Sequence, residues 1–158
     1  MNNLTRKIIQ AGFLVGTLDI LAAFIYFFVK SGDKNVSKIL KYIASGLFGK
    51  EAFSGGSMMI AAGLLLHYII AFAFTIFFFL VFPKASIFSK NKILTGIVYG
   101  IFIWMVMNLV VVPSSKIPNR PIEFSNAILS LVILVVCIGI PLSFMATRFY
   151  RNKHEAFN

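Results

Sequence analysis

The sequence predicts an all-α integral membrane protein, a four-helix bundle with an interfacial amphipathic helix between the first and second spans. The chain has 158 residues, of which 59% are hydrophobic and 13% charged, whereas about 25% are charged in soluble domains. Four long apolar runs, at 8–29, 57–82, 93–112 and 125–147, are separated by basic segments. The run 57–82 has no Asp, Glu, Lys or Arg, and as a helix it would measure roughly 39 Å, against about 30 Å of bilayer hydrocarbon.

We expect one transmembrane domain, residues 1–158, because a soluble protein of this size has too much surface to hide so many apolar side chains. The first run is longer than the apolar region of a signal peptide, which has about 7–15 residues. It ends in Lys30 without a small-residue cleavage site, so we expect it to be kept as the first span.

The net charge of +10 comes from 15 basic and 5 acidic residues. In a soluble domain this balance would suggest nucleic acid. Here the basic residues lie between the apolar runs, where they meet lipid headgroups, so we expect no nucleic-acid partner. Cys137 is the single cysteine, which excludes an intrachain disulfide and any C-x-x-C site.

In the first span, four residues recur at helical spacing and share one helix face: Gly12, Gly16, Asp19 and Ala23. Gly12 and Gly16 form a G-x-x-x-G pair, which allows another helix to approach closely. Asp19 lies near the middle of the span.

The segment after the first span predicts a short amphipathic helix at about 35–48, lying in the interface. Its apolar face is expected to hold Val36, Ile39, Leu40, Ile43 and Leu47, and its polar face Lys34, Lys38, Lys41 and Ser45. The three lysines would bind anionic lipid headgroups. The helix is either a simple anchor, which we favour, or a surface that recognises lipid or a partner protein.

In the second span, Gly63, His67, Ala71 and Thr75 recur every four residues and predict a small, partly polar face. The remaining surface would be covered toward lipid by five aromatic residues: Phe72, Phe74, Phe77, Phe78 and Phe79.

In the third span, a second G-x-x-x-G pair, Gly96 and Gly100, continues in the same row to Trp104 and Asn108. We predict these glycines, with Gly63, as helix-packing positions. In the fourth span, Gly139 and Pro141 predict a kink. Asn108 and Ser130 either line a shallow outer vestibule or act as interhelical glue, and we favour the second.

Loop charges predict the orientation weakly. With both termini in the cytoplasm, the inner side carries eight basic residues: Arg6, Lys7, Lys84, Lys90, Lys92, Arg148, Arg151 and Lys153. The outer side carries seven: Lys30, Lys34, Lys38, Lys41, Lys50, Lys116 and Arg120. The inner charges lie in shorter segments against helix ends, where the positive-inside rule acts most strongly, so we predict cytoplasmic termini.

Asp19 and His67 are the main candidate site, with Asn108 as a third member nearer the surface. Both lie about ten residues from span ends on the same side of the membrane, so we expect them at similar depth. An ionisable group at a helix centre costs at least ~2.5–3.5 kcal/mol and normally has a partner inside the bundle. The pair either handles a proton or locks the two helices in register, and the register lock is the simpler interpretation.

The sequence gives little support for a haem site, a metal site or an enzyme active site. Haem at His67 would need a second axial ligand, and the only other histidine, His154, is in the tail, so we expect no cofactor. Cys137 is expected to be packing, and no metal site is predicted. No Ser-His-Asp order, H-E-x-x-H motif, Walker loop or pair of carboxylates is present, so we expect no enzyme.

One stretch resembles a known family. His67 early in a long span, the exit VFPK at 81–84, a glycine-rich third span and Pro113 at its end resemble the YagU-like family of small bacterial inner-membrane proteins. The resemblance covers 67–113. It implies a multi-span helical fold in a bacterial inner membrane, and it carries no activity or catalytic residue with it.

Two functions from different classes follow. The first is a small-solute, proton or ion transporter or channel that uses Asp19 and His67, as a homo-oligomer if four helices leave too little room for water. The second is a non-transporting accessory protein that binds lipid or a membrane partner through its glycine faces and its basic amphipathic helix.

Overall fold

The computed structural model describes residues 3–84, 91–117 and 124–155. These residues are helical with short connections, and they contain no strand. Four helical segments among them are long and apolar enough to cross a membrane. They are α1 (Asn3–Ser31), α4 (Ser57–Val81), α6 (Lys92–Val106) continued by the π-turn η2 (Met107–Val111), and α7 (Phe124–Leu134) continued through the π-turn η3 (Val135–Gly139) into α8 (Ile140–Glu155).

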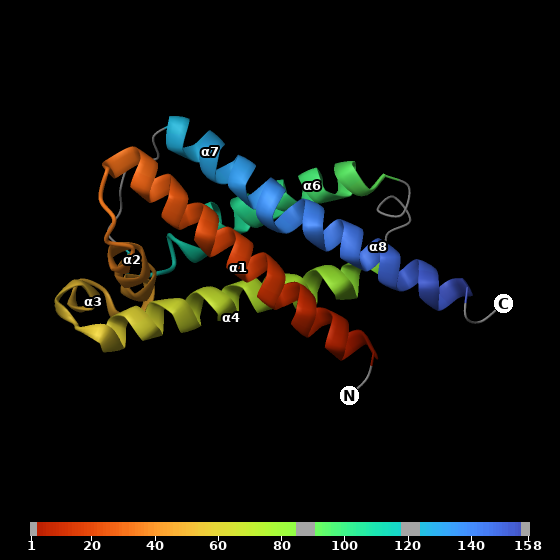
Figure 1. Cartoon of the computed structure of the whole chain (residues 1–158), viewed down its shortest axis with the longest axis horizontal. Helices are drawn as coiled ribbons and strands as arrows, with labels where there is room; N and C mark the ends of the chain where they lie inside the picture. The colour runs from red at the N-terminus through yellow and green to blue at the C-terminus, as the bar shows by residue number, and fades with distance from the viewer. Residues whose placement is uncertain (1–2, 85–90, 118–123, 156–158) are drawn as a thin grey trace.

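The predicted all-α four-helix bundle is confirmed, and the chain is a multi-pass membrane protein. Successive spans run in opposite directions, so the two termini lie at the same end of the molecule (Figure 1). The helices α2 (Ser37–Phe48) and α3 (Glu51–Ser54) lie at the opposite end, where α2 is seen almost end-on while α1 and α4 run across the view. We refer below to the terminal end and the α2 end of the bundle.

The fourth span changes its helical geometry next to Pro141, where the sequence predicts a kink. Proline has no N–H, so a regular helix would leave the carbonyl of Cys137 without its usual donor. The chain instead forms the wide turn η3, in which the N–H of Ile140 donates to the carbonyl of Val135. A π-turn of this kind is frequent at functional sites.

The predicted amphipathic helix forms as α2, but its packing face differs from the expected one. Leu40, Ala44 and Ser45 are buried, whereas Val36 and Leu47 are exposed. The cause is the contact with α4 at Gly63, where an added Cβ would lie 1.9 Å from the carbonyl oxygen of Leu40. Because Gly63 has no side chain, the α2 backbone sits directly on α4 and turns Ser45 inward, where its hydroxyl donates to the carbonyl of Tyr42 at 2.7 Å.

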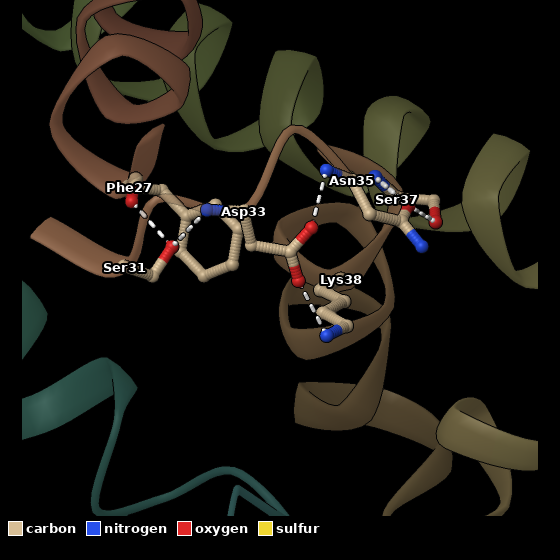
Figure 2. A network of polar contacts seen from close by, with 6 residues as sticks. All are labelled: Phe27, Ser31, Asp33, Asn35, Ser37 and Lys38. Atoms are coloured by element: carbon tan, nitrogen blue, oxygen red, sulfur yellow. Dashed lines mark hydrogen bonds and ion pairs between the residues drawn. The ribbon is translucent and has the colours of Figure 1, made fainter. Parts of the chain in front are cut away.

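A polar turn joins α1 to α2 (Figure 2). The Asp33 carboxylate accepts hydrogen bonds from the N–H of Asn35 at 2.8 Å and from Nζ of Lys38 at 2.5 Å. The hydroxyl of Ser31 donates to the carbonyl of Phe27 at 2.6 Å and accepts from the N–H of Asp33 at 3.2 Å. Lys38 is thus engaged by the protein itself, although headgroup contact was predicted for it.

The close-packed core lies between the middle of the bundle and its terminal end. It contains ten buried side chains: Ala11, Val15, Phe78, Phe79, Phe82, Tyr99, Ile103, Ile138, Leu142 and Ala146. Phe78 and Phe79 are only 2% and 1% exposed, so the prediction that they face lipid is wrong. The spans α6 and α8 close over that side of α4 here, and Phe78 packs on Tyr99 with ring centroids 4.5 Å apart.

Candidate intramembrane site

The first glycine pair brings α1 and α4 together, at the place where the candidate site residues lie. A Cβ on Gly12 would lie 2.5 Å from the ring of Phe72, and a Cβ on Gly16 would lie 3.0 Å from the ring of Tyr68. Ala71 is the other α4 residue against Gly16. The small face of α1 therefore packs against α4 within the same chain.

His67 makes a hydrogen bond across this interface. Its Nε2 donates to the backbone carbonyl of Gly16 at 2.8 Å. A carbonyl oxygen only accepts, so the proton must sit on Nε2. In the neutral ring Nδ1 is then an acceptor.

Asp19 lies one helical turn beyond Gly16, and its side chain is half-buried. Its carboxylate interacts electrostatically with His67 on α4 and with Cys137 in η3. None of the residues described in the structure forms a hydrogen bond or ion pair with this carboxylate. Asp19 and His67 are thus close enough for their charges to interact, while the hydrogen bond of the imidazole goes to the Gly16 backbone.

Asn108, the third predicted site residue, makes its contact elsewhere. It lies in η2, and its amide donates to the carbonyl of Trp104 in its own span at 2.9 Å. The indole N–H of Trp104 donates to the hydroxyl of Ser130 at 2.9 Å and so joins α6 to α7. This arrangement has the form of interhelical glue.

The second glycine pair packs against the π-turn η3. A Cβ on Gly96 would lie 2.7 Å from Cα of Ile140, and one on Gly100 would lie 2.6 Å from Cα of Val135. Gly139 completes the contact, since a Cβ there would lie 2.1 Å from the carbonyl oxygen of Gly96. From the sequence, Gly139 is predicted at a kink with Pro141, and this packing role is not among the predictions.

Three further residues form a cluster that the sequence analysis also missed, which we call the mouth cluster: Tyr26, Lys30 and Asn126. The hydroxyl of Tyr26 donates to Oδ1 of Asn126 at 2.7 Å, and Nζ of Lys30 donates to the same oxygen. The cluster joins α1 to α7 near the α2 end. Helical spacing was the available signal, because Asp19, Ala23, Tyr26 and Lys30 continue one face of α1.

A groove of about 750 Å³ lies along α1 and α4. Its walls are apolar and aromatic, and they include Phe13, Leu65, Tyr68 and Phe72. The hydroxyl of Tyr68 is 2.8 Å from the hydroxyl of Thr17. Neither Asp19 nor His67 lines the groove, so the groove and the Asp–His pair are separate features of one helix pair.

Among the described residues, no three His, Cys, Asp or Glu side chains gather in a way that could hold a metal ion. The resemblance to the YagU-like family stays a prediction. Comparison of the chain with protein families, curated proteins and solved structures finds no match.

Proposed function

We propose that this protein moves protons or small cations across a bacterial inner membrane, with Asp19 and His67 as the groups that take up and release them. The observation that carries the proposal is the half-buried carboxylate of Asp19, to which no described residue donates a hydrogen bond. A carboxylate kept in a span at a cost of at least ~2.5–3.5 kcal/mol without such a partner is better explained by ion handling than by packing.

The arrangement of His67 supports the same proposal. The Gly16 carbonyl fixes the ring through Nε2, so protonation is confined to Nδ1. The positive charge gained there is attracted by the Asp19 carboxylate. A fixed base beside a carboxylate is a suitable pair for passing one proton between helices.

Flux in proteoliposomes tests the proposal. The wild type is expected to dissipate an imposed pH or cation gradient, and Asp19→Asn and His67→Ala are expected to lose that flux. Asp33→Asn is the matched control, because it makes the same carboxylate-to-amide change in the turn outside the spans and should keep wild-type flux. Flux that survives in Asp19→Asn, or a wild type with no flux of protons or common cations, would rule the proposal out.

A second function, that of a non-transporting accessory protein, is favoured by the apolar groove. Both G-x-x-x-G pairs are already occupied by helices of the same chain, so a lipid chain or partner helix would have to use another surface. The groove beside Phe13 and Tyr68 is of suitable size and apolarity. If the protein has this accessory function, Asp19→Asn should still bind the lipid chain or partner helix, and Leu65→Trp should lose that binding because the indole fills the groove.

We also propose that both termini are cytoplasmic, which places α2 on the outer side. The shared end of the two termini is compatible with this orientation (Figure 1). A reporter fused at Asn158 is expected to be active inside the cell, and activity outside would reverse the orientation.

A further inference from the structure

The interior of the bundle is packed very differently at its two ends. Toward the terminal end it is filled by the close-packed core around Phe78, Phe79 and Leu142, whose side chains are at most 2% exposed. Toward the α2 end, α2 is packed on α4 at Gly63, but η2 and α7 contain no buried residue and α1 has none after Ile20. The close-packed core blocks the seam between α1 and the fourth span at the terminal end, whereas the part of the seam between α1 and α7 has no such core.

Polar side chains gather in this looser half. Trp104 bonds to Ser130, Asn108 bonds to Trp104, and Tyr26 bonds to Asn126. At the other end of the core, the hydroxyls of Tyr150 and Tyr99 each donate to a backbone carbonyl of α4. A chain of water molecules in the seam between α1 and α7 would find these side chains as partners toward the α2 end.

The seam between α1 and the fourth span connects the two sites of interest. Tyr26 is seven residues after Asp19, so the mouth cluster lies about 10 Å from the carboxylate along α1. At the inner end of the seam Asp19 interacts with Cys137, and at the outer end Tyr26 is bonded to Asn126. Asp19 and Tyr26 thus face the same span at two depths.

We propose that, in the conformation that the structure describes, water and protons reach Asp19 along this seam from the α2 end, and that the mouth cluster is the closure that opens to admit them. The amide oxygen of Asn126 accepts from two donors on α1, Tyr26 and Lys30, so movement of this one oxygen breaks two hydrogen bonds between the helices at this depth. The inference rests on the proposed function for its purpose, because it supplies the entry route to the proposed proton site.

The single cysteine is a native probe for this route, since Cys137 lies within electrostatic range of Asp19. A membrane-impermeant, cationic methanethiosulfonate reagent is applied to intact cells and to inverted vesicles, which present opposite faces. Ser54→Cys in a Cys137→Ser background reports which face carries the α2 end, because Ser54 is exposed on α3. Cys137 is expected to react only from the face at which Ser54→Cys reacts.

Variants of the mouth cluster test the closure. Tyr26→Phe removes one donor, and Cys137 should react about threefold and at most about twentyfold faster, the range for loss of one interhelical hydrogen bond. Asn126→Ala should act at least as strongly. Tyr150→Phe is the matched control, because it removes a hydroxyl bonded to the Phe79 carbonyl at the terminal end, outside the seam, and should leave the rate unchanged.

Reaction of Cys137 from the terminal face, equally from both faces, or from neither would overturn the inference. So would an unchanged rate in both Tyr26→Phe and Asn126→Ala. Flux is measured in parallel: one-sided reaction without flux keeps the route and removes the proposed function. Flux that depends on Asp19 with an unreactive Cys137 keeps the function and removes the route.

Discussion

The Nε2 atom of His67 donates a hydrogen bond to the backbone carbonyl of Gly16, 2.8 Å away on the neighbouring span. Gly16 lies three residues before Asp19, on the same face of α1. One contact therefore packs two helices, fixes the imidazole tautomer and holds the ring near a carboxylate. Both interpretations of this pair, a register lock and a proton site, depend on the same hydrogen bond. A substitution distinguishes them only if it keeps the hydrogen-bond donor and removes the titratable group.

Substitution of His67 provides that separation. His67→Ala removes the bond to Gly16, which should lower the free energy of unfolding by about 0.6 kcal/mol and at most ~1.7 for the bond itself. His67→Gln keeps an N–H donor and should recover part of this loss. Neither residue titrates, so both variants should lack flux. Thermal unfolding in detergent and proteoliposome flux check the two effects, and flux in His67→Gln would show that no imidazole is needed.

Asp19→Leu is predicted to stabilise the protein while it abolishes flux. No described residue donates a hydrogen bond to the carboxylate, so the substitution removes the cost of an ionisable group and breaks no bond. The gain should be about 2.5–3.5 kcal/mol in unfolding free energy, the cost of a carboxylate at a helix centre on insertion scales. Unfolding in lipid-detergent mixtures measures it. A loss of stability would instead identify Asp19 as a structural partner.

Hydropathy and spacing predict the spans, α2 and the glycine faces, because the bilayer itself dictates the length of each span and the apolar character of its surface. The first and last residues of the helices are less well predicted. The first helix begins at Asn3 and ends at Ser31, beyond the apolar run 8–29, since helical hydrogen bonding continues into the interface. The run 125–147 becomes three pieces around η3, because Pro141 interrupts the regular hydrogen-bond pattern.

The periodicity of one span does not predict which other helix packs against each of its faces. Phe78 and Phe79 look the same in sequence as Phe77, which is 45% exposed, and they differ because α6 and α8 close over one side only. Tyr26 and Asn126 are one hundred residues apart, and no local pattern pairs them. The partner of each face depends on how four helices pack around one another.

The loss of unfolding free energy on replacing a glycine with alanine is predicted to depend on which atoms the added Cβ would contact. Gly139→Ala places a Cβ 2.1 Å from the carbonyl oxygen of Gly96, and backbone cannot swing away, so it should cost about 1–3 kcal/mol or more. Gly12→Ala meets the ring of Phe72, which can rotate, and should cost less. Gly56→Ala meets nothing within 4 Å and serves as the control. Unfolding of the three variants in one detergent tests the order, and equal effects would contradict the backbone contact at Gly139.

The turn between α1 and α2 is predicted to lose order only in acid. The hydrogen bond from Lys38, followed by that from the Asn35 N–H, holds the pKa of Asp33 below its ordinary value of 3.8. A carboxyl whose pKa is lower in the folded state contributes stability that is fully present above the unfolded value and is lost as pH falls through the folded pKa.

The amide proton of Asn35 reports this titration directly, because it donates to the Asp33 carboxylate at 2.8 Å. Its NMR chemical shift should stay constant from neutral pH down to about pH 4 and then change with a midpoint below 3.8. Asp33→Asn should abolish the change, and Lys38→Met should move the midpoint up toward 3.8, since it removes the main cause of the lowered pKa. A wild-type midpoint at or above 3.8 would show that the turn in Figure 2 does not hold the carboxylate in solution.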